Sequence, residues 1–194
     1  MNGSKSRLDP QDTVVLFADL QAGIAEFAKT MPMDRLKKGV LALGKLAKLF
    51  DMPAVVSGIA GEDGSPAKVL PEIGDSLGPL PTHHRTTCDS FLNSDIRSAI
   101  VSTGRRTLLI AGVATELAVQ LPALTAADLG YRVHVVIDAC GGMSERTEEA
   151  ALLRLLHAVV TPVSVITLAG ELAGELTSPR AQQAVGILFA MAGS

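Results

Sequence analysis

The sequence predicts an α/β fold in which helices cover both faces of a parallel sheet. Short apolar runs alternate with longer segments of helical periodicity, which is the pattern of such a sheet. Hydrophobic residues make up 47% of the chain but aromatic residues only 3%, so the core must be built from Val, Leu, Ile and Ala. The 194 residues suit one well-filled domain and no repeat or linker divides them. We expect a single domain over residues 1–194.

Short apolar runs bounded by polar or turn-forming residues predict the strands. In chain order these runs are 13–18, 54–58, 80–84, 107–112, 133–138 and 163–167.

Helical periodicity is clearest in the segments 33–50, 94–102, 116–129 and 145–158. In the first of these, apolar residues recur at three- and four-residue spacing and predict one buried stripe: Leu36, Val40, Leu43, Ala47 and Phe50. Gly130 follows the third segment and suits a helix C-terminal cap. The longest stretch without a predicted element, roughly 60–79, is rich in Gly and Pro. We expect it to lie over the strand ends as a functional loop.

A last helix is predicted at 179–192, with Ser178 as its N-cap and Pro179 in its first turn. Apart from Arg180, Gln182 and Gln183, its residues are apolar or small. That is more apolar surface than a one-sided stripe requires. The helix either packs on its own domain or contacts another subunit. We expect the second, in a symmetric homo-oligomer of at least two chains.

Composition excludes several classes of function. The net charge is −3 and no basic block occurs, which argues against nucleic acid as a partner. Two cysteines are too few for a disulfide framework, and the first fifteen residues lack a signal-peptide pattern. No apolar run reaches the roughly 18 residues that a membrane span needs. We therefore expect a cytoplasmic protein that acts on a small molecule, without membrane or nucleic-acid partners.

Three features fall where predicted strands end, the edge at which parallel sheets bind ligands. Asp19 closes the first apolar run and Arg85 follows the third. Taken alone, Asp19 is equally well explained as a helix N-cap, and Arg85 as a charge on a surface loop. The third feature is the turn before Ala118, where backbone N–H groups at a helix start can hold an oxyanion. Pro122 donates no N–H to the carbonyl of Ala118, so we expect the first turn of this helix to be distorted.

These segments together resemble the isochorismatase-like cysteine hydrolases, and within them the YcaC-like branch. The resemblance covers nearly the whole chain and rests above all on Ile110-Ala111-Gly112-Val113-Ala114-Thr115-Glu116 and Asp138-Ala139-Cys140-Gly141. It implies a Rossmann-like six-stranded sheet of order 3-2-1-4-5-6. It also implies an acid–cation–thiol triad that hydrolyses C–N bonds in small amides.

The resemblance assigns roles residue by residue. Asp19 matches the family's general acid/base, and Arg85 stands where most members have Lys and the YcaC-like branch has Arg. Ala118 stands where the family has its nucleophilic Cys. The backbone amides of Ala114 and Ala118 would form the oxyanion hole, and the peptide bond between Val113 and Ala114 is expected to be cis.

Ala118 leaves three interpretations open. In the first interpretation, a laboratory substitution has replaced the nucleophilic Cys of an active enzyme by Ala118. Alternatively, the chain is a natural enzyme that works without a thiol, as relatives that hydrolyse isochorismate do with Asp as the acid; Arg85 in place of Lys makes isochorismate itself a poor candidate. In the third interpretation the chain is a catalytically silent oligomeric binding or scaffold protein.

Residues near these positions are candidates for substrate binding: Gln21, Glu116, Cys88 and Phe91. Read structurally, Glu116 is an acid at a helix start and Cys88 a small buried hydrophobe. Cys140 is expected to pack.

We predict no metal and no cofactor. Family relatives that bind zinc use an Asp/His set after the second strand, and the segment 57–63 has no His. Gly58, Gly61 and Gly64 do not form a phosphate-binding fingerprint.

Overall fold

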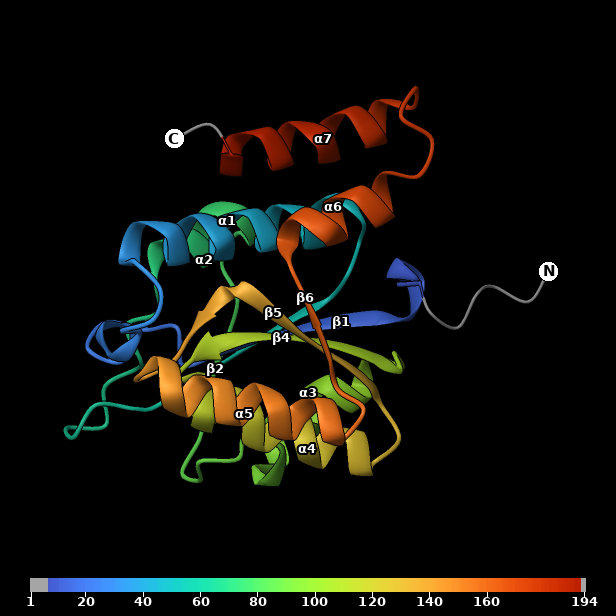
Figure 1. Cartoon of the computed structure of the whole chain (residues 1–194). Helices are drawn as coiled ribbons and strands as arrows, with labels where there is room; N and C mark the ends of the chain where they lie inside the picture. Colours follow the sequence, from blue (N-terminus) through green and yellow to red (C-terminus); the bar gives the residue numbers. More distant parts are fainter. Residues whose placement is uncertain (1–6, 193–194) are drawn as a thin grey trace.

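Six parallel strands form one sheet in the order β3-β2-β1-β4-β5-β6 (Figure 1). The computed structural model describes residues 7–192. The strand order and direction confirm the predicted fold class. The strands are β1 (Thr13–Ala18), β2 (Ala54–Gly58), β3 (Thr82–His84), β4 (Thr107–Val113), β5 (Arg132–Gly141) and β6 (Thr161–Val163).

Helices cover both faces of the sheet (Figure 1). One face carries α1 (Met33–Leu49), α2 (Pro71–Leu77) and α6 (Val165–Ala173). The opposite face carries α3 (Ser94–Ser102), α4 (Gln120–Asp128) and α5 (Glu145–His157). The last helix, α7 (Pro179–Ala192), forms a further layer outside α1 and α6.

The central strand β1 shows why the strands read as apolar runs in the sequence. Every one of its side chains is buried. Val15 and Phe17 pack into the core on the α1 side, whereas Leu16 and Ala18 pack into the core on the α3 and α4 side. Because both faces of the sheet are covered, the strand is continuously apolar and does not alternate with polar residues.

The predicted strand at 163–167 is wrong: β6 ends at Val163 and α6 begins at Val165. The Ser164 hydroxyl accepts a hydrogen bond from the backbone N–H of Thr167 at 3.0 Å. The Asp138 carboxylate accepts one from the N–H of Val165 at 2.8 Å. These caps satisfy donors of the first helical turn, and they outweigh the strand propensity of a β-branched run.

The stretch from Ala60 to Pro79 also holds more structure than predicted. It contains α2, which begins with Pro71 in its first turn and packs beside α1 (Figure 1). The predicted strand at 80–84 is reduced to Thr82–His84, since Pro81 has no N–H to donate to a strand ladder. Gly130 has a φ of 85° after the end of α4, as the predicted C-terminal cap requires.

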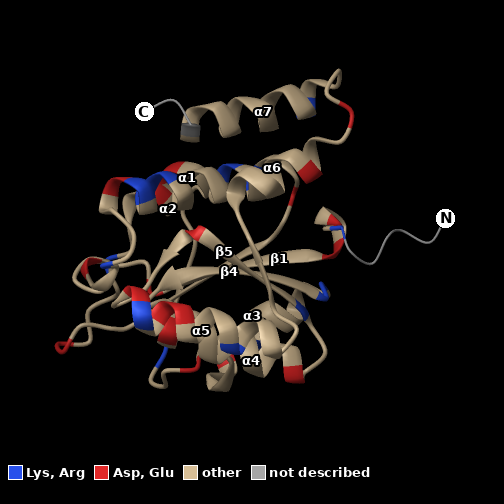
Figure 2. Ribbon diagram, viewed as in Figure 1, with Lys and Arg blue, Asp and Glu red and all other residues tan. Residues whose placement is uncertain are grey.

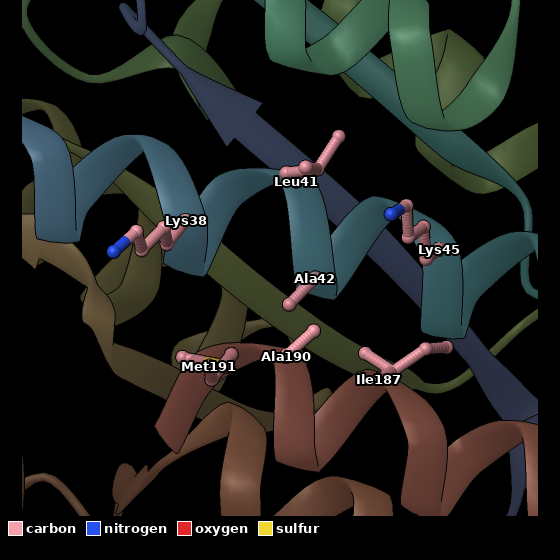
Figure 3. A pocket seen from close by; sticks show the side chains of 7 residues that line it. All are labelled: Lys38, Leu41, Ala42, Lys45, Ile187, Ala190 and Met191. Carbon is pink, nitrogen blue, oxygen red and sulfur yellow. The ribbon is translucent and has the colours of Figure 1, made fainter. Parts of the chain in front are cut away.

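One face of α7 packs on its own domain. The Ser178 hydroxyl accepts a hydrogen bond from the N–H of Ala181 at 3.1 Å, which confirms the predicted N-cap. Ala181 and Ala184 are buried. Further along, α7 and α1 enclose a narrow crevice of about 50 Å³ (Figure 3), lined by Lys38, Leu41, Ala42, Lys45, Ile187, Ala190 and Met191.

The outer face of α7 is unusually apolar for a surface helix. Arg180 is its one charged residue, and Figure 2 shows the rest of the helix without charge. Phe189 is 66% exposed. Packing on the domain's own core therefore explains why the inner face of α7 is apolar, but it does not explain the exposed Phe189. None of the helices in the described part of the chain has the length and apolar character that crossing a membrane requires.

At Gly39, α1 approaches β5 so closely that a side chain has no room. A Cβ there would lie 1.9 Å from the carbonyl oxygen of Asp138, whereas a Cβ at Gly170 in α6 would meet nothing within 4 Å. We expect Gly39→Ala to lower the free energy of unfolding by about 1–3 kcal/mol, because the backbone must shift. Gly170→Ala should raise it by about 0.5–1 kcal/mol. Urea unfolding measures both, and a neutral or stabilising Gly39→Ala would contradict the close approach.

Candidate active site

Residues from three separate segments meet at the carboxyl edge of the sheet. Asp19 follows β1, Arg85 follows β3, and Ala118 lies on the helical turn after β4. All three line one pocket of about 280 Å³. The rest of its lining is Ile24, Phe27, Ile59, Val113, Ala114, Leu117 and Met143. The structure therefore brings the predicted acid, the predicted cation and the predicted nucleophile position to one place.

The Asp19 carboxylate is buried and bonded to Arg85. Asp19 is 1% exposed, and its two oxygens accept hydrogen bonds from Nε of Arg85 at 2.9 and 2.8 Å. Oδ2 also accepts one from Nη2. The backbone N–H of Asp19 donates to the carbonyl of Ser57 at 3.0 Å, which continues the strand pairing into this residue. Its φ of 55° is in the left-handed region, which Asp adopts more readily than most residues.

Arg85 is held from both ends. Its backbone N–H donates to the carbonyl of Gly58 at 2.9 Å, and its Nη1 donates to the carbonyl of Thr87 at 2.7 Å. Burial by itself lowers the pKa of Arg85, but the Asp19 carboxylate and the Cys88 thiol beside it raise that pKa above its ordinary value. The side chain is 11% exposed. Arg85 is therefore a partly buried, charged partner of Asp19 and not a surface loop charge.

An ion pair with one buried and one partly buried partner is a weak source of folding stability. Taking each charge out of water costs several kcal/mol, and the attraction between the two charges often only offsets that cost. The pair also lines a pocket, and a raised pKa such as that of Arg85 is typical of functional sites in such a place. We therefore interpret Asp19 and Arg85 as groups positioned for chemistry.

The chain leaves β4 through an irregular turn. The peptide bond between Val113 and Ala114 is cis, as predicted. Residues Thr115–Val119 then form a π-helical turn before α4 begins at Gln120. This distortion lies where Pro122 withholds the N–H that would bond the carbonyl of Ala118. Ala118 itself is 2% exposed, and its methyl group is part of the pocket wall.

Outside the Asp19–Arg85 pair, the residues that line the pocket are apolar. Three of them remain well exposed: Phe27 at 51%, Leu117 at 44% and Met143 at 49%. These three side chains form what we call the apolar rim. Sequence reasoning did not find it. Met143 lies just beyond the end of β5, and Ile59 directly follows β2. Their positions after strand ends could have identified both as lining residues from the sequence.

Glu116 connects two walls of the pocket. Its carboxylate accepts hydrogen bonds from the N–H of Met143 at 2.9 Å and from the hydroxyl of Thr147. Beside it, the hydroxyl of Thr115 donates to Glu148 at 2.7 Å. These bonds fasten the π-helical turn to the beginning of α5, and they place Met143 over the pocket. Glu116 itself is not among the lining residues.

Of the other substrate-binding candidates, Gln21 and Cys88 lie next to lining residues, whereas Phe91 lies in the core. The Gln21 amide donates to the carbonyl of Ile59 at 3.0 Å and accepts from its N–H at 2.8 Å, so it positions a lining residue. Phe91 is fully buried and meets Tyr131 edge to face, with ring centroids 5.8 Å apart. Cys88 is exposed, next to Arg85. Direct contact of these side chains with substrate stays a prediction.

Neither cysteine occupies the pocket lining. Burial raises the pKa of the Cys140 thiol to about 12, which suits the packing role that we expected for it. Across residues 7–192, no three His, Cys, Asp or Glu side chains gather as a metal site would require.

Comparison with known proteins places this site in a family. A family model described as the isochorismatase domain matches residues 13–167. A curated relative, the probable hydrolase YcaC of Escherichia coli (strain K12), is 38% identical over 153 residues, which are 78% of this chain and 73% of the relative.

Solved structures agree over nearly the whole chain. The YcaC gene product of Escherichia coli, described as an octameric hydrolase of unknown specificity, superposes with a TM-score of 0.86 at 33% identity, covering 97% of this chain and 91% of the other. YcaC from Pseudomonas aeruginosa, solved with hexane-2,5-diol and covalent acrylamide, gives a TM-score of 0.87 at 31% identity, with coverage of 97% and 95%.

Proposed function

This chain belongs to the isochorismatase family, in its YcaC-like branch, and on that premise we propose that its pocket is the active site of a hydrolase for small amides. Position 118 is the place of the nucleophile. The observation that carries the proposal is the convergence of Asp19, Arg85 and Ala118 on one pocket. The relative from Pseudomonas aeruginosa was solved with covalent acrylamide, an electrophile to which nucleophilic side chains add, and this supports nucleophilic chemistry as the class to test.

With a thiol at position 118, each residue has a defined role. Asp19 accepts the thiol proton, and the thiolate attacks the amide carbonyl carbon to give a tetrahedral intermediate. The backbone N–H groups of Ala114 and Ala118 stabilise the oxygen that becomes negative. Asp19 returns the proton to the leaving nitrogen as the C–N bond breaks. Water then hydrolyses the thioester, with Asp19 as the base, and frees the carboxylic acid.

Arg85 supports this cycle by fixing Asp19. Both carboxylate oxygens accept hydrogen bonds from the guanidinium, an arrangement that suits a proton acceptor better than a protonated acid. This favours thiol chemistry over a route in which Asp19 begins as the acid. No Ser, Thr or Cys is among the lining residues that the structure describes. With Ala118, we propose that the chain binds its substrate but forms no covalent bond with it.

The substitution Ala118→Cys tests the proposal. We expect the pKa of the introduced thiol to lie about 1–3 units below the roughly 8.5 of free cysteine, because position 118 lies at the start of a helical segment, whose backbone N–H groups and dipole stabilise a thiolate. The rate of alkylation by iodoacetamide as a function of pH, followed by peptide mass spectrometry, measures this pKa. Free cysteine measured under the same conditions provides the reference, because Cys88 itself lies beside Arg85, and buried Cys140 should stay unmodified while the protein is folded.

The matched control adds Asp19→Asn to the Ala118→Cys variant. It should slow amide hydrolysis, measured as ammonia release, by about 10²- to 10⁴-fold, the usual contribution of a general acid–base group. An introduced thiol whose reactivity does not differ from that of free cysteine would support a silent scaffold protein and count against the enzyme.

We further propose that the chain forms a homo-oligomer with α7 in the contact. The outer face of α7 presents Phe189 without a partner in its own domain, and the Escherichia coli relative is an octamer. Phe189→Asp should lower the molar mass measured by light scattering at micromolar concentration, because a charge would be buried without a partner. Gln183→Asp, an exposed site on the same helix, is the control and should leave the mass unchanged. A monomeric parent protein would overturn this proposal.

A further inference from the structure

The pocket offers a substrate very little charge. Of its ten lining residues, eight are apolar: Ile24, Phe27, Ile59, Val113, Ala114, Leu117, Ala118 and Met143. The other two are Asp19 and Arg85, which are bonded to each other. Their charges cancel, so the pocket as a whole is close to neutral.

Arg85 is poorly placed to bind an anionic group of the substrate. Its Nε and Nη2 donate to Asp19, and its Nη1 donates to the carbonyl of Thr87. A substrate carboxylate that approached the guanidinium would meet the negative charge of Asp19 at the same point. It would lose its water on entering an apolar pocket without gaining a cation of its own, and an unpaired buried charge is costly.

The apolar rim extends the same preference outward. Phe27, Leu117 and Met143 leave between 44% and 51% of their surface in water. A hydrocarbon chain that lies against them removes apolar surface from water on both sides, at about 25 cal/mol per Å². The volume of about 280 Å³ is near the lower end of the range for small-molecule pockets, which restricts the substrate to a compact one.

We infer that the site selects uncharged amides with a short hydrocarbon acyl group and rejects substrates that carry a carboxylate. This inference rests on the proposed function for the identity of the reacting bond. The selectivity itself is a property of the walls: the neutral ion pair at the floor excludes anions, and the apolar rim holds the acyl chain. Met143 is the specificity-determining position most open to change, because it is exposed and held through its backbone by Glu116.

The test is binding to the full-length chain with Ala118 in place, which needs no turnover. Hexanamide and hexanoate have nearly the same shape and differ in charge at pH 7. Ligand-detected NMR titration should give an affinity for hexanamide at least about 10-fold higher than for hexanoate. Equal or tighter binding of hexanoate would overturn the inference, as would the absence of binding by either compound at millimolar concentration.

A charge placed on the rim provides a second, independent readout. Met143→Lys should raise the affinity for hexanoate about 10-fold, because the new cation supplies the missing partner. Leu153→Lys adds the same charge at an exposed position of α5 outside the pocket lining, and it should change neither affinity. Equal effects of the two substitutions would contradict a selectivity set by the rim.

Failure of this inference is distinguishable from failure of the proposed function. If hexanamide binds selectively but the Ala118→Cys variant does not hydrolyse it, the reaction is wrong and the selectivity stands. If that variant releases ammonia while the parent chain binds hexanoate as well as hexanamide, the selectivity is wrong and the reaction stands.

Discussion

The ion pair between Asp19 and Arg85 is the interaction on which the architecture of the site depends. The two residues follow β1 and β3, which are separated in the sheet by β2, so the guanidinium bridges across the end of an intervening strand. Backbone bonds to Ser57 and Gly58, the last residues of β2, hold both partners in line with the sheet. Burying two charges here gives little stability. The desolvation cost of the two charges falls at the carboxyl ends of the parallel strands, which is where ligands bind.

In our proposal the floor of the pocket carries the chemistry and the rim the selectivity. The floor combines the ion pair with the irregular turn after β4, where the methyl group of Ala118 lines the pocket. The rim comes from loops that are fastened from outside the pocket. Gln21 bonds both backbone polar groups of Ile59, and Glu116 bonds the N–H of Met143. Two of the predicted substrate contacts, Gln21 and Glu116, therefore also hold residues that line the pocket.

Much of the fold and the floor of the site could be predicted from the sequence, because both follow from local patterns. Buried parallel strands give apolar runs, and Asp19 and Arg85 stand where two of those runs end. The errors in the prediction arose where contacts between distant segments determine the local structure. The run after Val163 has strand propensity, but the Asp138 carboxylate caps it as a helix across 27 positions of sequence. Phe91 is close to Arg85 in sequence and packs on Tyr131 in the core, a contact that the sequence did not indicate, and its part in substrate binding stays a prediction. The rim was missed because its loops take their shape from bonds between distant segments.

Our central claim is that the Asp19–Arg85 ion pair serves the pocket and adds little to folding stability. A double-mutant cycle on the free energy of unfolding tests this claim most directly. Arg85→Gln should lower the free energy of unfolding by about 3–5 kcal/mol, because it leaves the buried Asp19 carboxylate unpaired, and Asp19→Asn should lower it by less, because the guanidinium is only partly buried. The double variant, which has no buried charge, should recover to within about 1 kcal/mol of the parent or exceed it. A double variant as unstable as the single variants would show that the pair holds the fold together, and it would contradict this account.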